Sequence, residues 1–187
     1  MPASMRVSRS VPCRCRAACR SKSTPSSKLP DPMSSNVASR LQAKGLVLPP
    51  APVPVATYVG FVTVGKLVHV AGVGPTWGKE VRHAGKVGSD LSVEQGYAAA
   101  QLTGLNLLAH MSTACDGDLD RIARCVKVFA LVNAGPDFND AHIVANGVTD
   151  LFADLFGADK LPVRALTTAP SLPLNIAFEA DAVFLLH

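Results

Sequence analysis

Acidic residues are missing from the first thirty positions of this 187-residue chain. The same segment contains many serines and seven basic residues: Arg6, Arg9, Arg14, Arg16, Arg20, Lys22 and Lys28. This composition is typical of an organellar transit peptide. The alternative, a basic arm for nucleic acid, lacks aromatic residues between its charges. We therefore expect residues 1–33 to be a disordered transit peptide for a chloroplast or a mitochondrion, with a cytoplasmic location as the alternative, and residues 34–187 to form one domain.

The predicted domain has few basic residues and no long apolar run. After residue 30, eleven basic residues remain against all fourteen acidic ones, a net charge of −3. This balance offers no broad cationic surface for a phosphate backbone, so nucleic acid is an unexpected partner. No stretch after the leader has the roughly 18 uncharged apolar residues that span a bilayer. We expect a soluble protein without a membrane partner.

Cysteine is scarce in the domain, where only Cys115 and Cys125 occur. We therefore do not expect a disulfide framework, and a reducing compartment is compatible with the sequence. The five histidines are isolated and show no metal-ligand spacing, so we expect neither a metal nor a cofactor. The GxSxG motif of hydrolases is absent. The glycines in GVGPTWG (72–78) lack the strand and helix that flank a nucleotide-binding loop.

Periodicity and turn residues outline the secondary structure of the domain. A short amphipathic helix is expected from Ser34 to Gly45, and the four prolines between 48 and 56 predict an extended connector. Two longer helices are expected at 92–114, capped by Asp90 or Ser92, and at 137–157. The expected β-runs are 58–64, 67–71, 125–133, 163–168 and 176–186, with a possible short ribbon between 77 and 87. This order predicts an α+β fold, with a mixed or antiparallel sheet covered on one face by two helices.

Two charged residues stand out within the apolar C-terminal strands. Arg164 is the only charge between Leu161 and Phe178, and Glu179 follows it in FEADAVFLL. Desolvating either group is costly unless it is paired or meets a charged ligand. If the two strands pair, the side chains could line one pocket, with a forked cation for a carboxylate and an acid or base beside it. A salt bridge between the strands, or at a subunit interface, is the alternative.

Six segments carry a resemblance to a known family. They are APVPVATY (51–58), VNAGPDFND (132–140), ANGVTDLF (145–152), VRALTT (163–168), LPLN (172–175) and FEADAVF (178–184). In this order and spacing the chain resembles the YjgF/Rid family of reactive intermediate deaminases, also called L-PSP endoribonuclease-like proteins, and within it the subgroup with an ANGxxDL motif. The resemblance implies a chorismate-mutase-like α+β fold and a homotrimer with three clefts at the subunit interfaces.

The resemblance also implies roles for individual residues. Arg164 would hold the carboxylate of a small 2-imino or 2-keto acid through two parallel hydrogen bonds, and Glu179 would position the water that attacks the imine carbon. The backbone carbonyl of Leu166 would accept a hydrogen bond from the imine nitrogen. The other residues expected to bind the substrate are Tyr58, Asn146 and Gly72.

The sequence departs from well-known imine deaminases at two places in this cleft. Ala71-Gly72-Val73 stands where they have Ser-Gly-Gln, and Ala165-Leu166 stands where they have Ser-Cys. Both changes make the cleft more apolar, which fits either a more hydrophobic ligand or a site that binds without turnover. The expected function is hydrolysis of enamine or imine intermediates to 2-keto acids and ammonia. A non-catalytic metabolite-binding or partner-regulating trimer is the alternative, and single-stranded RNA cleavage is disfavoured by the negative domain.

Overall fold

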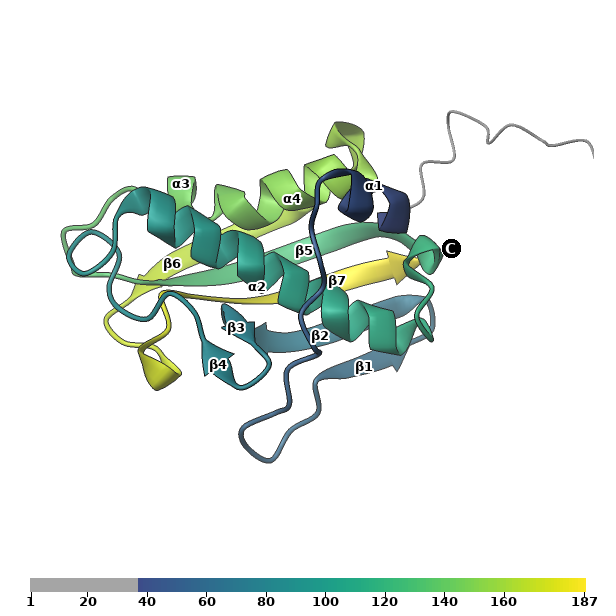
Figure 1. Ribbon diagram of the computed structural model, residues 1–187, viewed down its shortest axis with the longest axis horizontal. Coiled ribbons are helices and arrows are strands. Elements are labelled where there is room, and N and C mark those ends of the chain that lie inside the picture. Colours follow the sequence, from purple (N-terminus) through teal and green to yellow (C-terminus); the bar gives the residue numbers. More distant parts are fainter. Residues whose placement is uncertain (1–36) are drawn as a thin grey trace, which may run out of the picture. The chain divides into compact units, whose positions relative to one another are not determined.

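A five-stranded mixed sheet forms the centre of the protein, which is described here from a computed structural model over residues 37–187 (Figure 1). The predicted leader at 1–33 lies outside the described residues. The spatial order of the strands is β1-β2-β7-β5-β6. Their bounds are β1 Phe61–Val64, β2 Leu67–Val73, β5 Ile122–Asn133, β6 Val163–Ala169 and β7 Phe178–Leu186. Neighbouring strands are antiparallel except β5 and β6, which are parallel, so the sheet is mixed as predicted.

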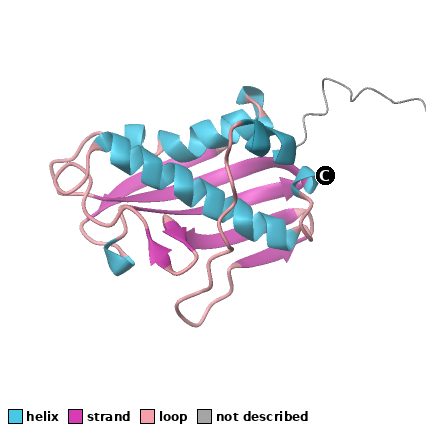
Figure 2. Cartoon of the chain, in the orientation of Figure 1, coloured by secondary structure: helices cyan, strands magenta, loops and turns pink. Residues whose placement is uncertain are grey.

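Two helices lie side by side over one face of the sheet, as Figure 2 shows. The long helix α2, Val93–Ala114, begins with a capping box in which the Ser92 and Gln95 side chains bind each other's backbone amides. The second helix, α4, spans Asn146–Phe156 and follows the single-turn helix α3, Ala141–Val144. This arrangement confirms the predicted α+β class with two helices on one face of the sheet.

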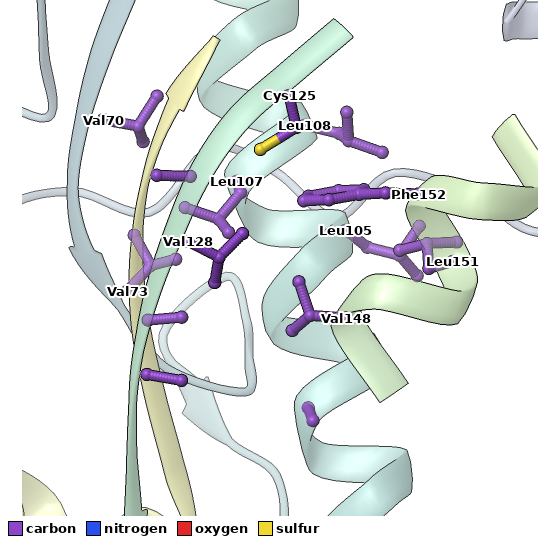
Figure 3. Packing of buried hydrophobic residues seen from close by; sticks show 14 of the residues in the cluster. Val70, Val73, Leu105, Leu107, Leu108, Cys125, Val128, Val148, Leu151 and Phe152 are labelled. Atoms are coloured by element: carbon purple, nitrogen blue, oxygen red, sulfur yellow. The ribbon is translucent and has the colours of Figure 1, made fainter. Parts of the chain in front are cut away.

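The hydrophobic core lies between this helical layer and the sheet. Every second residue at the start of β7 is buried, beginning with Phe178 and Ala180, because alternate side chains of a strand point to opposite faces. Figure 3 shows Leu107 of α2 and Val128 of β5 meeting in this layer, with Phe152 of α4 beside them. Burial of these large side chains supplies the main stabilisation of the fold.

The remaining elements are short. The first helix, α1, spans Val37–Ala43, within its predicted range. The ribbon expected between 77 and 87 is the two-stranded pair β3, Thr76–Trp77, and β4, Glu80–Val81. Three single-turn helices complete the fold: η1 Leu119–Arg121, η2 Ala158–Lys160 and η3 Pro173–Asn175. None of the helices within residues 37–187 combines the length and the hydrophobicity that a bilayer span requires.

The helix predicted at 137–157 differs from the observed structure. It begins at Ala141 and is interrupted at Ala145, so that α3 and α4 are separate elements. Gly147 follows the interruption, and there a Cβ would lie 2.9 Å from the backbone nitrogen of Gln101 on α2. The glycine lets α4 approach α2 closely, and Tyr97 reinforces the contact by donating a hydrogen bond from its hydroxyl to Asp150, at 3.0 Å.

Candidate functional site

A cavity of about 490 Å³ opens at the end of β2. Its walls come from the proline-rich connector, the segment from β2 to β4, helix α2, the η3 turn and β7. The polar side chains that line it are Tyr58, Thr76, Lys79, His110 and Glu179. Three of the predicted site residues, Tyr58, Gly72 and Glu179, are therefore brought together in one place.

A β-bulge positions Glu179 at this cavity. Val70 pairs with Ala182, and Val73 pairs with Ala180. Ala71 and Gly72 therefore lie opposite a single residue of β7, Asp181. Bulges bend a strand locally and often occur beside functional sites. A Cβ on Gly72 would lie 2.5 Å from Oε1 of Glu179. The carboxylate therefore lies over the bulge in space that only glycine leaves open.

The Glu179 carboxylate is half-buried and accepts no hydrogen bond from residues 37–187. Burial raises the pKa of Glu179 above its ordinary value, and the nearby charge of Asp181 raises it further. A carboxylate whose pKa is shifted toward neutrality is a better general base, because it holds the proton that it accepts more firmly. The group is thus suited to take a proton from a water or a ligand in the cavity.

Another part of the cavity wall is an unusual turn. Leu174 and Asn175 both adopt positive φ, at 55° and 53°, a conformation that is uncommon for leucine. The buried side chain of Asn133 holds the turn by donating hydrogen bonds to Asn175 Oδ1, at 3.1 Å, and to the carbonyl of Ile176, at 3.0 Å. Leu174 is 66% exposed and lines the cavity. Backbone strain of this kind concentrates at functional sites, where the surrounding structure holds it in place.

Arg164 lies outside this cavity, on the edge strand β6. Its Nη1 donates hydrogen bonds to Asn146 Oδ1, at 3.0 Å, and Thr149 Oγ1, at 3.1 Å, while Nη2 donates to the carbonyl of His142, at 3.3 Å. Burial lowers the pKa of Arg164, and the charge of Asp150 acts in the opposite direction. No carboxylate within residues 37–187 forms a salt bridge with Arg164. The guanidinium is oriented by neutral oxygens, and its charge remains available to an anion.

The other two predicted residues belong with Arg164. Asn146, the first residue of α4, supplies one of the acceptors that orient the guanidinium. The side chain of Leu166 on β6 packs against the hydrophobic core and does not line the cavity. The predicted site is thus divided into two groups, which we call the glutamate group (Tyr58, Gly72 and Glu179) and the arginine group (Asn146, Arg164 and Leu166).

The two groups lie on opposite faces of the sheet. Strands β6 and β7 do not pair, because β5 runs between them, so the single pocket that their pairing would have formed is absent. On β5, Val128 is the partner of Arg164 and Leu131 is the partner of Glu179. Paired residues share a face, and residues an odd number of positions apart on one strand point to opposite faces. Arg164 therefore points to the helical side and Glu179 to the open side.

The cavity also contains residues that the sequence did not single out. His110 on α2, Thr76 and Lys79 come from segments that carry no recognisable motif, and only the fold brings them to the cavity. No cluster of three or more potential metal ligands occurs in the described part of the chain. The chemistry available from these residues is that of an acid or base, hydrogen-bonding groups and a cation.

Comparisons with known proteins give this fold a family. Residues 38–184 match the profile of the family described as "YjgF/chorismate_mutase-like, putative endoribonuclease". Protein TCP17 of Trypanosoma cruzi is 37% identical over 151 residues, which cover 80% of this chain and 94% of TCP17.

Two solved structures extend the comparison. Protein Atu1372 of Agrobacterium tumefaciens, a protein of unknown function, has 34% identity and a TM-score of 0.75, covering 81% of this chain and 92% of that one. A Shewanella oneidensis protein that carries the same endoribonuclease label has 30% identity and a TM-score of 0.76, covering 81% of this chain and 99% of that one. The chain therefore belongs to the YjgF/chorismate mutase-like family.

Proposed function

We propose that this protein is a homotrimeric, Rid-like imine hydrolase of the ANGxxDL subgroup, with a binding cleft at each subunit interface. Each cleft combines the glutamate group of one protomer with the arginine group of the next. The observation that carries the proposal is the placement of Glu179 and Arg164 on opposite faces of one sheet. A second copy supplies the missing charge to each group, and closed symmetry makes the same contact three times.

The open face of the sheet is the surface on which the second copy docks. No helix within residues 37–187 covers this face, and three valines on it are well exposed: Val62 by 50%, Val64 by 61% and Val163 by 68%. These valines lie on the two edge strands, β1 and β6, and exposed apolar side chains on one sheet face favour an interaction surface. The glutamate group adjoins this same face, so an interface formed there brings the partner's arginine group to the cavity.

The proposed reaction needs only these groups and a water. Arg164 holds the carboxylate of a 2-imino acid in a fixed orientation. Glu179 removes a proton from water as the water oxygen bonds to the imine carbon, and a carbinolamine forms. The proton then passes from Glu179 to the nitrogen. The carbon–nitrogen bond breaks as the carbinolamine hydroxyl gives its proton back to Glu179 and becomes the carbonyl, so ammonia leaves behind a 2-keto acid. Water and imine are consumed in equal amounts, and no oxidant or cofactor takes part.

Mixed trimers test the shared cleft directly. Arg164→Gln and Glu179→Gln chains, each inactive alone, are co-expressed with different tags, and trimers that contain both tags are purified. Each trimer that contains both chains forms one of its three clefts from two intact halves, so keto-acid release from 2-iminopropanoate returns to about a third of the wild-type rate. Co-expression of untagged and tagged Arg164→Gln chains is the matched control. Mixed trimers that stay as inactive as the single variants would contradict a cleft shared between protomers.

A non-catalytic binding trimer is the second candidate, favoured by the apolar residues Ala71, Val73 and Val81 in the cavity wall. It predicts that Glu179→Gln retains binding of a 2-keto acid while wild-type protein releases keto acid no faster than buffer. The endoribonuclease label of the relatives gives a third candidate. Cleavage of single-stranded RNA that disappears in Arg164→Ala would support it, although the net charge of −3 after residue 30 opposes RNA binding.

The leader remains part of the proposal. Residues 1–33 direct the protein to a chloroplast or a mitochondrion, and the domain assembles without them. Deleting these residues leaves the trimer intact in gel filtration. A shortened protein that runs as a monomer would contradict this assignment.

A further inference from the structure

Two polar groups in the cavity lack hydrogen-bond partners. The His110 side chain is only 5% exposed, lines the cavity and forms no hydrogen bond with residues 37–187. The hydroxyl of Thr76 also belongs to a cavity-lining residue, and it is buried without a partner. Neither group takes part in the proposed hydrolysis. Burying the Thr76 hydroxyl without a partner is unfavourable unless a water or a ligand binds it, so its presence indicates a polar ligand.

The fold holds His110 in a defined place. Its ring lies against the backbone of Gly60, where a Cβ would lie 2.5 Å from Cε1 of the imidazole. The ring of Phe61 packs nearby, with centroids 6.3 Å apart and planes tilted by 59°. Burial lowers the pKa of His110, so the imidazole is neutral near pH 7 and offers one donor and one acceptor.

Helix α2 also positions Thr76. The buried Asn106, one turn before His110, donates hydrogen bonds to the carbonyls of Gly74, at 2.9 Å, and Thr76, at 2.8 Å. These bonds fix the loop from β2 to β3 against the helix. The acceptor oxygen of Asn106 has no partner among the described residues. Helix α2 therefore carries His110 and also holds Thr76, two cavity-lining residues whose polar side chains lack a hydrogen-bond partner within residues 37–187.

The rest of the wall is apolar. Besides the glycines, the lining residues without polar side chains include Pro50, Pro52, Pro54, Val73, Leu174 and Ile176. A ligand that fills this space needs an apolar side chain. If it also reaches His110 and Thr76, that side chain needs a hydrogen-bonding group at its end. A three-carbon acid has neither feature beyond its reacting atoms. The cavity thus matches a larger side chain than that of alanine.

We propose that His110 and Thr76 form a specificity subsite for the side chain of the substrate. The subsite selects 2-imino and 2-keto acids whose apolar or aromatic side chain ends in a hydroxyl or amide. This inference rests on the proposed function, because it assumes that the acid's carboxylate lies at the interface with Arg164. It adds the substrate class, which neither Glu179 nor Arg164 determines.

Three keto acids and direct binding test the subsite without any turnover. Pyruvate, phenylpyruvate and 4-hydroxyphenylpyruvate are titrated into the trimer in a calorimeter, and the last two differ by a single hydroxyl. We expect 4-hydroxyphenylpyruvate to bind about tenfold more tightly than phenylpyruvate, because the hydroxyl partners buried polar groups. Pyruvate, which leaves the subsite empty, binds most weakly. Equal affinities for the two aromatic acids would overturn the subsite.

Two variants assign the preference to the named residues. His110→Phe and Thr76→Val each remove a hydrogen-bonding group at similar volume, and each reduces the tenfold preference while phenylpyruvate still binds. The matched control is His187→Phe at the exposed C-terminus, which leaves the preference unchanged. Two variants are used so that, if one of them folds poorly, the other still tests the subsite. A preference that survives in the folded variant would also overturn the subsite.

The failures of the two proposals are distinguishable. If the hydroxyl preference depends on His110 but 2-imino acids are not hydrolysed faster than in buffer, the subsite stands and the hydrolase fails. If 2-iminopropanoate is hydrolysed but the two aromatic acids bind equally, the hydrolase stands and the subsite fails. Binding of none of the three acids overturns the subsite together with the carboxylate site.

Discussion

Arg164 and Glu179 lie one strand apart on opposite faces of the sheet, and their surroundings differ in kind. Three hydrogen bonds to neutral oxygens fix the guanidinium at the β6 edge. The carboxylate, by contrast, lies beside a cavity and accepts no hydrogen bond within residues 37–187. An orienting group benefits from rigid support, whereas a group that exchanges protons must keep its lone pairs free. The setting of Arg164 therefore suits a group that holds the ligand carboxylate, which we call the anchor, and the setting of Glu179 suits a base.

Exchanging the base for its amide gives the largest expected effect. Glu179→Gln keeps the shape of the side chain but cannot take a proton, so turnover of 2-iminopropanoate falls by about 100-fold or more. Affinity for a 2-keto acid changes little, because the anchor is untouched. The release of keto acid and a parallel binding titration measure the two quantities. Asp181→Asn is the matched control, since Asp181 lies two residues along the same strand and face but does not line the cavity. Equal losses in both variants would remove the special role of Glu179.

Replacing Arg164 should instead change ligand affinity, because Arg164 is the proposed carboxylate-binding residue. Arg164→Lys keeps a positive charge but loses the forked geometry that binds Asn146, Thr149 and a carboxylate together, so 2-keto acid affinity falls about tenfold. The melting temperature without ligand stays near that of the wild type, because the bonds that are lost are partly solvent-exposed. A melting temperature that falls in step with affinity would instead favour a purely structural role.

A comparison with Lys79 tests more sharply whether Arg164 is the residue that holds the carboxylate. It is the only cationic side chain that lines the cavity in the described part of the chain, so it could hold a carboxylate within a single protomer. If Lys79→Gln abolishes keto-acid binding while Arg164→Lys preserves it, the cleft is complete without a partner. We expect the reverse, with keto-acid binding weakened more by Arg164→Lys than by Lys79→Gln.

Removing the space above the bulge tests how closely Glu179 is positioned. A Cβ at Gly72 displaces only the flexible end of the Glu179 side chain, so Gly72→Ala lowers turnover about tenfold and changes stability by less than about 1 kcal/mol. Gly135→Ala is the control, because a Cβ there meets nothing within 4 Å and φ at Gly135 is not positive. Loss of turnover in both variants would show that the effect is not local to the carboxylate.

The sequence was sufficient for most of the elements and for the face on which Glu179 lies, but it predicted one helix over 137–157 where the structure has two. Ser92 and Gln95 mark the start of α2, and the buried alternation around Glu179 already places that residue on the face opposite Phe178 and Ala180. For Arg164 the neighbours in VRALTT are apolar or small on both faces, so the pattern does not say which way it points. Local patterns encode periodicity, and they determine a side chain's face only where the two faces differ in polarity.

The strand order and the cavity could not be derived in the same way. Placing β5 between β6 and β7 is a non-local choice among pairings that local sequence does not distinguish. His110 and Thr76 belong to unremarkable segments, and they meet at the cavity only because Asn106 ties the loop after β2 to α2. A buried polar residue in a helix is a weak signal by itself, since most such residues are satisfied within the fold.

The pH dependence of stability gives the smallest effect and tests the setting of Glu179 itself. Because the pKa of Glu179 in the folded state is raised above its ordinary value of 4.5, the folded protein binds this proton more tightly than the unfolded chain does. The resulting stabilisation is complete below pH 4.5 and is lost as pH rises through the raised pKa. Glu179→Gln does not suffer this loss, so its melting temperature exceeds that of the wild type at pH 8, by at most about 2 °C, and the difference shrinks toward pH 4.

Other groups near the carboxylate set the controls for this measurement. Asp181 on the same strand and His110 in the cavity wall also have shifted pKa values, but both titrate in the wild type and in Glu179→Gln, so most of their effect cancels in the difference. Differential scanning fluorimetry of both proteins across pH 4 to 8 gives the curve. A difference that is independent of pH would mean that folding leaves the pKa of Glu179 unchanged. A difference that reverses sign would mean that Glu179 is stabilised as a carboxylate in the folded protein, which is the setting of an ion-pair partner and not that of a base.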